Sequence, residues 1–138
     1  MKKRSSGTGV FLLTVGDEIL DGRIQNTNAS WFGEQLRSAG IRVSESRSVP
    51  DRVKSIASAL QEGARSPVVL VTGGLGPTND DRTLEAAAAA FRLPLEETPA
   101  SLQHVRSRYQ ARGLPLTPAR LKMARVPRSS HVLANPTG

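Results

Sequence analysis

Most of the architecture follows from one segment, Val68-Val-Leu-Val-Thr-Gly-Gly-Leu-Gly-Pro-Thr-Asn-Asp-Asp-Arg-Thr83. It begins with a short apolar run, which is typical of a strand buried on both faces of a parallel sheet. Three glycines follow within Gly73–Gly76, where a backbone without Cβ atoms can turn sharply and approach a ligand. Thr83 is expected to cap the next helix, with Glu85 in its first turn. Because a helix start favours anions, the segment predicts a phosphate or pyrophosphate site.

Alternatives to a phosphate site stay open at this point. The glycines could form only a strand-to-helix turn, although one glycine would suffice for that. The segment lacks both the Gly-Lys-Ser/Thr ending of a Walker A loop and the third glycine of the dinucleotide fingerprint. Asp80 and Asp81 would repel an anion unless a cation such as Mg²⁺ binds carboxylate and phosphate together. Otherwise one of the two aspartates caps a helix or hydrogen-bonds the loop.

Length and composition are those of a single globular domain. The 138 residues suffice for a hydrophobic core, and we place a disordered basic tail at 1–9 and the domain at 10–138. The absence of cysteine excludes disulfides and thiolate metal sites and is compatible with the cytoplasmic location that we expect. No apolar run approaches the length of a membrane span, so no membrane partner is expected.

The basic surplus is concentrated late in the chain. The net charge is +7, and much of it lies between Arg92 and Arg128. Such a surplus can attract nucleic acid, anionic lipid or phosphorylated small molecules. Only Tyr109 interleaves with these basic residues, so a base-stacking platform is poorly supported and nucleic acid is not the expected partner. The simplest interpretation is a solvated basic face.

Hydrophobic patterns predict alternating strands and helices. This order favours a largely parallel sheet with helices on both sides and right-handed crossovers. His104 and His131 have no ligand-like neighbours and are given no role. The predicted strands are 10–15, 41–49 (half-exposed, near an edge), 68–72 and 131–134, and the predicted helices are 29–39, 52–64, 83–91, 99–112 and 118–124.

Polar residues follow the predicted strands and begin the predicted helices. Asp17 and Glu18 come directly after the first strand, where open α/β sheets place their sites, although a plain polar loop is the alternative. Asn26 or Asn28 either caps the next helix or reaches a ligand. Asp51 is a plausible cap for the helix after it. The helix over 29–39 carries a set of apolar residues for a core or an interface: Trp31, Phe32, Leu36 and Ala39.

Three motifs together resemble one family. The segment 16–22 (Gly-Asp-Glu-Ile-Leu-Asp-Gly), with Asn-Thr-Asn at 26–28, resembles the opening of the CinA N-terminal domain. Residues 72–81 resemble its central loop, and 133–138 resemble its Asn-Pro-x-Gly turn. The resemblance runs from about Val10 to the end. Because that domain belongs with MoaB and MogA, it implies a molybdopterin-binding α/β/α sandwich with a mostly parallel sheet and a pocket at the strand C-termini.

The resemblance implies two activities that make or break P–O–P bonds. CinA-type N-terminal domains are associated with metal-dependent hydrolysis of ADP-ribose at its pyrophosphate, aided by potassium. MogA-type proteins adenylylate molybdopterin, which would then be the ligand. A third interpretation is a non-catalytic nucleotide-binding module. We favour the hydrolase, which would use Mg²⁺, Mn²⁺ or Co²⁺ and would act on a nucleotide rather than a pterin phosphate.

The same resemblance implies roles for individual residues. Asp80 and Asp81 would hold the metal, and Asp17 or Glu18 would complete its shell or orient water. Asp51, after Val49-Pro50, matches a second acid of the MogA-like site. The phosphate or nucleotide would be bound by Gly73, Gly74, Leu75, Gly76, Thr78, Thr83, Asn26 and Asn28.

The resemblance also sets expectations about the extent of the chain. The family domain normally continues past the Asn-Pro-x-Gly turn, whereas this sequence stops at Gly138, so we expect a domain truncated at its C-terminus. The separate C-terminal deamidase domain of full CinA is not matched, so no deamidase activity is expected. Related proteins form dimers or trimers, which implies a homo-oligomer.

Overall fold

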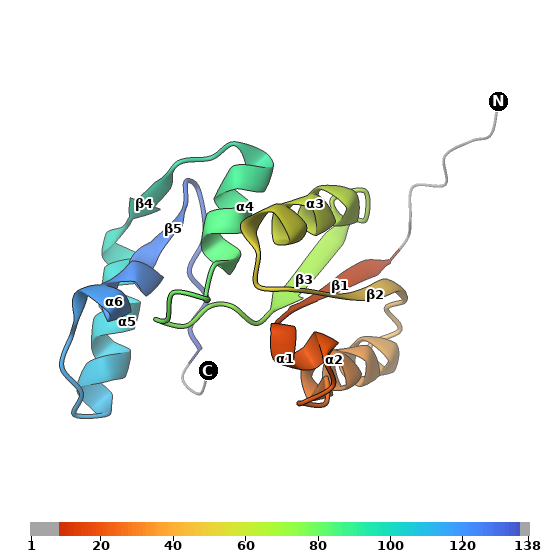
Figure 1. The fold of residues 1–138 in the computed structure, drawn as a ribbon, viewed down its shortest axis with the longest axis horizontal. Coiled ribbons are helices and arrows are strands. Elements are labelled where there is room, and N and C mark those ends of the chain that lie inside the picture. Colours follow the sequence, from red (N-terminus) through yellow and green to blue (C-terminus); the bar gives the residue numbers. More distant parts are fainter. Residues whose placement is uncertain (1–8, 136–138) are drawn as a thin grey trace.

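A parallel sheet of three strands organises the structure, a computed structural model that describes residues 9–135. The strand order is β2-β1-β3, with bounds Val43–Val49, Val10–Val15 and Val68–Thr72. Helix α2 (Thr27–Ser38), after the short α1 (Asp17–Leu20), lies on one side of the sheet (Figure 1). Helices α3 (Val53–Gly63) and α4 (Thr83–Phe91) lie on the other side. The predicted α/β fold with a parallel sheet is confirmed.

Strand β1 forms the centre of the main core. All six of its residues are buried, as its continuous apolarity predicted, and β1 pairs with both neighbours. Phe11 and Leu13 pack with Ile56 of α3 and Ala86 of α4. A Cβ at Gly63 would lie 2.7 Å from the Phe11 ring. Small residues in the two helices therefore allow a close approach to the sheet.

A smaller unit follows α4 and has a core of its own. Its strands β4 and β5 are antiparallel, and Val105, Tyr109 and Ala124 are buried together. Strand β5 also lies against α4. The elements of this unit are β4 (Leu95–Glu97), α5 (Pro99–Ala111), α6 (Pro118–Leu121), the 3₁₀ helix η1 (Lys122–Ala124) and β5 (Arg125–Pro127).

The predicted last strand at 131–134 is wrong. These residues pair with no strand within the described range, and the late strand is instead β5, which pairs with β4. Two three-residue strands are too short to show a hydrophobic period, which explains why the pattern missed both. The predicted tail lies outside the described residues except for Gly9, and the predicted turn at 135–138 does so except for Asn135.

The burial of β3 is lower than its apolar sequence predicted. In residues 9–135, β3 has a strand neighbour only at β1, and Val68 is 48% exposed. Strand β3 is therefore an edge of the described sheet rather than a strand buried on both faces. The predicted edge position of β2 is confirmed, because β2 pairs only with β1 among these strands.

Helix α2 has the cap at Asn26 that the sequence offered, begins two residues before the predicted start at Ala29, and buries none of its residues. Asn26 is the N-cap and accepts a hydrogen bond from Ala29 N at 3.1 Å, while Gly40 has the positive φ of a helix-ending residue. The helix turns small residues, including Ala29 and Gly33, towards the sheet, where they line a hollow. Trp31 consequently stays 56% exposed. Of the two roles left open for the apolar residues of α2, the structure does not show the core role, and the interface role stays a prediction.

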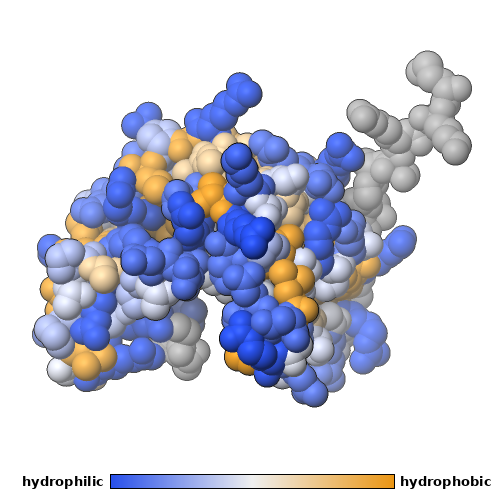
Figure 2. All heavy atoms as spheres, viewed as in Figure 1, coloured by the Kyte–Doolittle hydropathy of each residue, from blue (hydrophilic) through white to orange (hydrophobic). Residues whose placement is uncertain are grey.

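The surface of the described residues is mostly hydrophilic. Figure 2 shows apolar side chains scattered over one face, which is hollowed at its lower edge between the part with α5 and the part with α1 and α2. No described helix is long and apolar enough to cross a membrane.

Candidate functional site

The glycine loop after β3 is shaped by its contacts with the rest of the fold. Gly73 and Gly74 have φ values of 90° and 65°, where side chains with a Cβ are strained. A Cβ on Gly73 would overlap the carbonyl oxygen of Val15, and one on Gly74 would overlap the Thr83 hydroxyl. Packing at the end of β1 thus requires both glycines, so the turn interpretation accounts for them without any ligand.

Thr83 secures this turn and does not cap α4. Its hydroxyl donates to Gly73 O at 2.7 Å, and its backbone N–H donates to Gly74 O at 3.1 Å. The N-cap of α4 is Arg82, which makes no side-chain cap hydrogen bond. The predicted cap is therefore wrong, because the Thr83 hydroxyl is buried against the loop. Glu85 lies in the first turn as expected, where it pairs with Arg82 at 2.8 Å.

Asp81 closes the loop on itself. Its Oδ2 accepts hydrogen bonds from Thr78 N at 2.8 Å and from Thr78 Oγ1 at 2.6 Å. Burial acts to raise the pKa of Asp81, but the hydrogen bonds from Thr78 and the nearby Lys122 charge outweigh it and lower the pKa. A Cβ on Gly76 would lie 2.6 Å from Asp81 Oδ2. Of the two roles left open for Asp81, the structure shows the hydrogen-bonding one.

Four predicted acids come together at the carboxyl ends of the three parallel strands. Asp17 and Glu18 follow β1, Asp51 follows β2, and Asp80 follows β3. Asp17 N donates to Asp51 Oδ2 at 3.0 Å. Burial raises the pKa of Asp51, the hydrogen bond from Asp17 N opposes this, and the negative charges of the other three acids raise it further.

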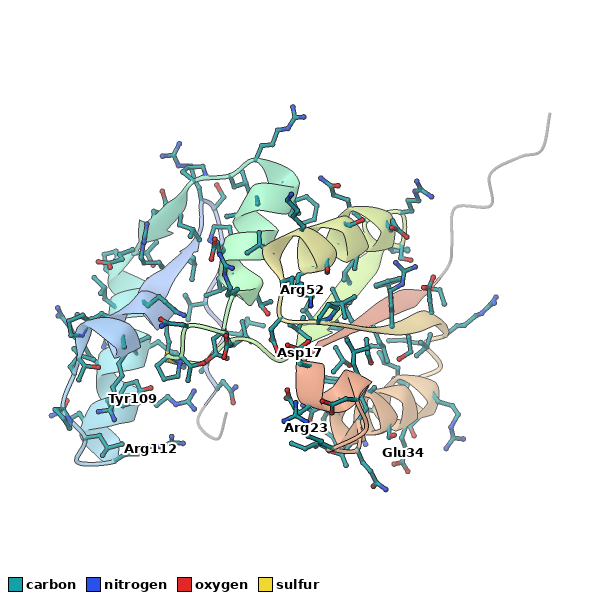
Figure 3. All side chains as sticks on the ribbon, viewed as in Figure 1. Asp17, Arg23, Glu34, Arg52, Tyr109 and Arg112 are labelled. Carbon is teal, nitrogen blue, oxygen red and sulfur yellow. The ribbon has the colours of Figure 1, made fainter. Side chains whose placement is uncertain are left out.

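Asp51 holds the start of α1 rather than capping α3. The N-cap of α3 is Arg52, which makes no side-chain cap hydrogen bond. Figure 3 shows Asp17 at the start of α1, close to the connection between β2 and α3 that carries Arg52. The predicted cap role of Asp51 is thus wrong, while its predicted place among the site acids agrees with this arrangement.

Two hollows border the loop, and the other predicted site residues are distributed between them. The smaller, of about 180 Å³, is lined by Glu18, Asn26, Asn28 and Gly73 among others. Asn26 is already engaged there, since its Nδ2 donates to Thr14 Oγ1 at 3.0 Å while its Oδ1 caps α2. The larger hollow, of about 510 Å³, is lined by the loop residues Gly74, Leu75, Gly76 and Asp81 and, from the smaller unit, by Leu95, Lys122, Met123 and Arg125.

Lys122 is a residue of this site that sequence reasoning missed. Its Nζ donates to Thr78 O and, at 2.9 Å, to Asp81 O, so it joins η1 to the loop. The expected place of Lys122 on a solvated basic face is wrong for this residue. The separation of 41 residues between Lys122 and Asp81 left no local signal for the contact.

The fold and the loop are those of a known family. Residues 11–137 match the family described as "Probable molybdopterin binding domain", so the chain belongs to this family. A CinA-like protein of Myxococcus xanthus is 45% identical over 130 residues, which are 94% of this chain and 31% of that protein. A protein of Aeropyrum pernix is 45% identical over 129 residues, 93% of this chain and 48% of that protein. The chain therefore spans a third to a half of these relatives.

Solved structures agree with the sequence relatives. CinA from Thermoplasma acidophilum superposes with a TM-score of 0.87 at 37% identity, covering 97% of this chain and 79% of that one. MoaB from Thermus thermophilus gives a TM-score of 0.56 at 28% identity, with 83% and 69% covered. The resemblance to the CinA N-terminal domain within the MoaB/MogA group is thereby confirmed.

Proposed function

We propose that this CinA-like domain hydrolyses the pyrophosphate bond of a nucleotide of the ADP-ribose type, with a divalent metal as cofactor. One observation carries the proposal. Four carboxylates from the ends of three parallel strands gather beside the glycine loop, namely Asp17, Glu18, Asp51 and Asp80. Parallel α/β sheets bind their ligands at this edge. Acids alone would repel a pyrophosphate, so a cation must accompany the substrate.

The donor set fits a metal that is shared with the substrate. Within residues 9–135, no group of three or more His, Cys, Asp or Glu side chains is placed to hold an ion. Mg²⁺ commonly binds one or two carboxylates and takes its remaining ligands from phosphates and water. Asp80, with Asp17 or Glu18, would hold the ion. Asp81 is less suited than the sequence implied, because its Oδ2 is engaged by Thr78.

The other steps of the proposed hydrolysis are assigned to the metal ion, to a carboxylate and to the loop backbone. When bound, a divalent ion such as Mg²⁺, Mn²⁺ or Co²⁺ neutralises pyrophosphate oxygens and lowers the pKa of water. Asp51, whose pKa is raised by burial and by its acidic neighbours, is the candidate acceptor for the proton of the attacking water. The backbone of Gly73, which lines the smaller hollow together with Glu18, would position a phosphate. Potassium, which the resemblance also implies, has no assigned residue.

The test is AMP release from ADP-ribose with Mg²⁺, Mn²⁺ or Co²⁺ in the presence of K⁺. We expect Asp80→Asn to lower kcat by roughly 10²-fold or more, the scale of a lost catalytic group. Asp21→Asn is the matched control, because Asp21 pairs with Arg23 at 2.7 Å on the exposed surface. Equal activity of the two variants, or no release by the folded parent, would contradict the proposal.

A second candidate function is molybdopterin binding with adenylyl transfer. The family match over residues 11–137 and the likeness to MoaB favour it. It predicts consumption of ATP only when the pterin is present. A non-catalytic nucleotide-binding module would instead be stabilised by ADP-ribose without turnover, by roughly 2.7 kcal/mol at 100 times Kd. Assembly into dimers or trimers and a cytoplasmic location stay predictions.

A further inference from the structure

We propose that α5 carries a second anion site, which takes a phosphate group of a small molecule and is separate from the glycine loop. Three basic side chains, His104, Arg108 and Arg112, recur at intervals of four residues over α5 and its C-cap. Residues four apart lie on the same face of a helix, so the three form one basic row.

The basic row borders a hollow to which no described residue contributes an acid. The hollow has a volume of about 450 Å³, and its lining consists of His104, Ser107, Arg108, Ala111, Arg112, Ala134 and Asn135. Neither arginine belongs to an ion pair with a described residue. Figure 3 shows Arg112 at the end of α5, in the part of the molecule that borders the hollowed lower edge seen in Figure 2. The site therefore has positive charge that no described residue compensates, around an open hollow.

Arg108, in the middle of the row, has a donor without a hydrogen-bond partner among the described residues. Arg108 Nε is buried and has no hydrogen-bond partner in the described part of the chain. A buried donor of a charged group without a partner destabilises the fold, and an acceptor placed beside it removes that cost. A phosphate in the hollow suits Arg108, which lines it, because a guanidinium binds two phosphate oxygens in one plane. The Ser107 hydroxyl supplies a further donor at the rim.

The arrangement favours a small phosphorylated molecule over nucleic acid. Among residues 9–135, no aromatic side chain lines the hollow. Tyr109 on the same helix is 7% exposed, and Arg120 lies over its ring at 4.6 Å. Single-stranded nucleic acids need stacking surfaces along a continuous groove. Arg106, the other arginine of the helix, is not part of the basic row and lines a separate hollow with Tyr109.

The test follows the Arg108 Nε–H signal by NMR while inorganic phosphate is added at constant ionic strength, with chloride as the balancing anion. We expect a saturable shift at Arg108 and none of that size at Arg106. Arg108→Gln should weaken phosphate binding, followed at the His104 ring, at least about tenfold, since it removes a charge-assisted pair. Arg106→Gln is the matched control and should change the Kd less than twofold. Asp80→Asn should also leave it unchanged, which separates this site from the proposed hydrolase.

The opposing outcomes are equally definite. Shifts that never saturate, or that chloride alone reproduces, would show a solvated basic face and overturn the proposal. If an oligonucleotide displaced phosphate from Arg108 at a far lower concentration, the ligand of this site would be a nucleic acid rather than a small molecule, which overturns the proposal. Should Arg108→Gln fail to fold, the titration of the parent still decides, because the Arg108 signal reports the site directly.

Discussion

At the scale of single residues, the glycine loop shows how packing and ligand binding can demand the same amino acid. Gly73 and Gly74 meet Val15 and Thr83 so closely that no side chain fits. The sequence alone offered a ligand as the better reason for three glycines, yet the contacts supply a sufficient one. The proposed phosphate function of the loop therefore rests on its backbone and on the neighbouring acids.

The free-energy cost of a side chain that overlaps Val15 can be separated from the cost of placing a side chain on a residue with positive φ. Gly73→Ala should destabilise the protein by roughly 3 kcal/mol or more, because left-handed strain adds to the overlap with Val15 O. Gly22→Ala shares a positive φ of 77° but meets nothing within 4 Å, so we expect only about 1–2 kcal/mol. Urea unfolding measures both. Equal values would mean that the overlap relaxes freely.

The Asp81–Thr78 closure should be visible as a pH dependence. Because the folded-state pKa of Asp81 is lowered, its ionised form stabilises the fold above the unfolded-state pKa. That stability is lost as the pH falls through the folded-state value. At neutral pH, Asp81→Ala should cost about 1–2 kcal/mol through the lost hydrogen bonds. Asp81→Asn should flatten the acid limb of a stability–pH profile, and Asp80→Ala serves as the neighbouring control. A profile identical to the parent would refute the closure.

At the scale of elements, prediction succeeded where an element is buried by neighbours on several sides. The predicted strand 10–15 and the predicted helix 52–64 are both present, and Ile56 and Leu60 of that helix pack in the core with β1. Prediction failed where few residues carry the signal. The strands β4 and β5 have three residues each, and α2 approaches the sheet through small side chains that a hydrophobic pattern overlooks. The acids at the strand ends were predictable for a topological reason, namely that parallel strands end at one edge.

Truncation of a β1 side chain should show how much the main core contributes to the free energy of unfolding. Leu13 is 1% exposed, and Leu13→Ala should cost roughly 2–5 kcal/mol because a cavity remains. Leu133→Ala is the matched control, since Leu133 is 83% exposed and such surface changes stay within about 0.5 kcal/mol. Thermal or urea unfolding followed by circular dichroism compares the two. Similar losses of stability for Leu13→Ala and Leu133→Ala would mean that Leu13 is not part of the core.

At the scale of the whole molecule, the main sheet and the smaller unit each have a core, and the larger hollow beside the glycine loop lies where they meet. Lys122 on η1 binds the carbonyls of Thr78 and Asp81, which belong to the glycine loop. No pattern in the sequence connects residues this far apart, so the junction could be learned only from the folded chain. This hollow is consequently sensitive to how the two units are held together.

Removing the Lys122 link should loosen the loop before it unfolds the protein. Lys122→Met keeps the length of the side chain but removes both hydrogen bonds, for an expected loss of roughly 1–3 kcal/mol. Amide hydrogen exchange should accelerate over residues 74–82 while β1 stays protected. Lys54→Met changes an exposed lysine of α3 and should alter neither. Unchanged exchange in the loop would show that η1 does not restrain it.

The exposed position of Trp31 has a practical consequence for spectroscopy. Trp31 is the only tryptophan of the chain and is 56% exposed, and its ring is roughly perpendicular to that of Phe32, with 5.1 Å between the ring centroids. Its fluorescence in the folded monomer should therefore already be red-shifted and open to quenching by iodide. Denaturation will change this emission little, so it is a poor reporter of global unfolding. A concentration-dependent blue shift would instead report that a second molecule has covered α2.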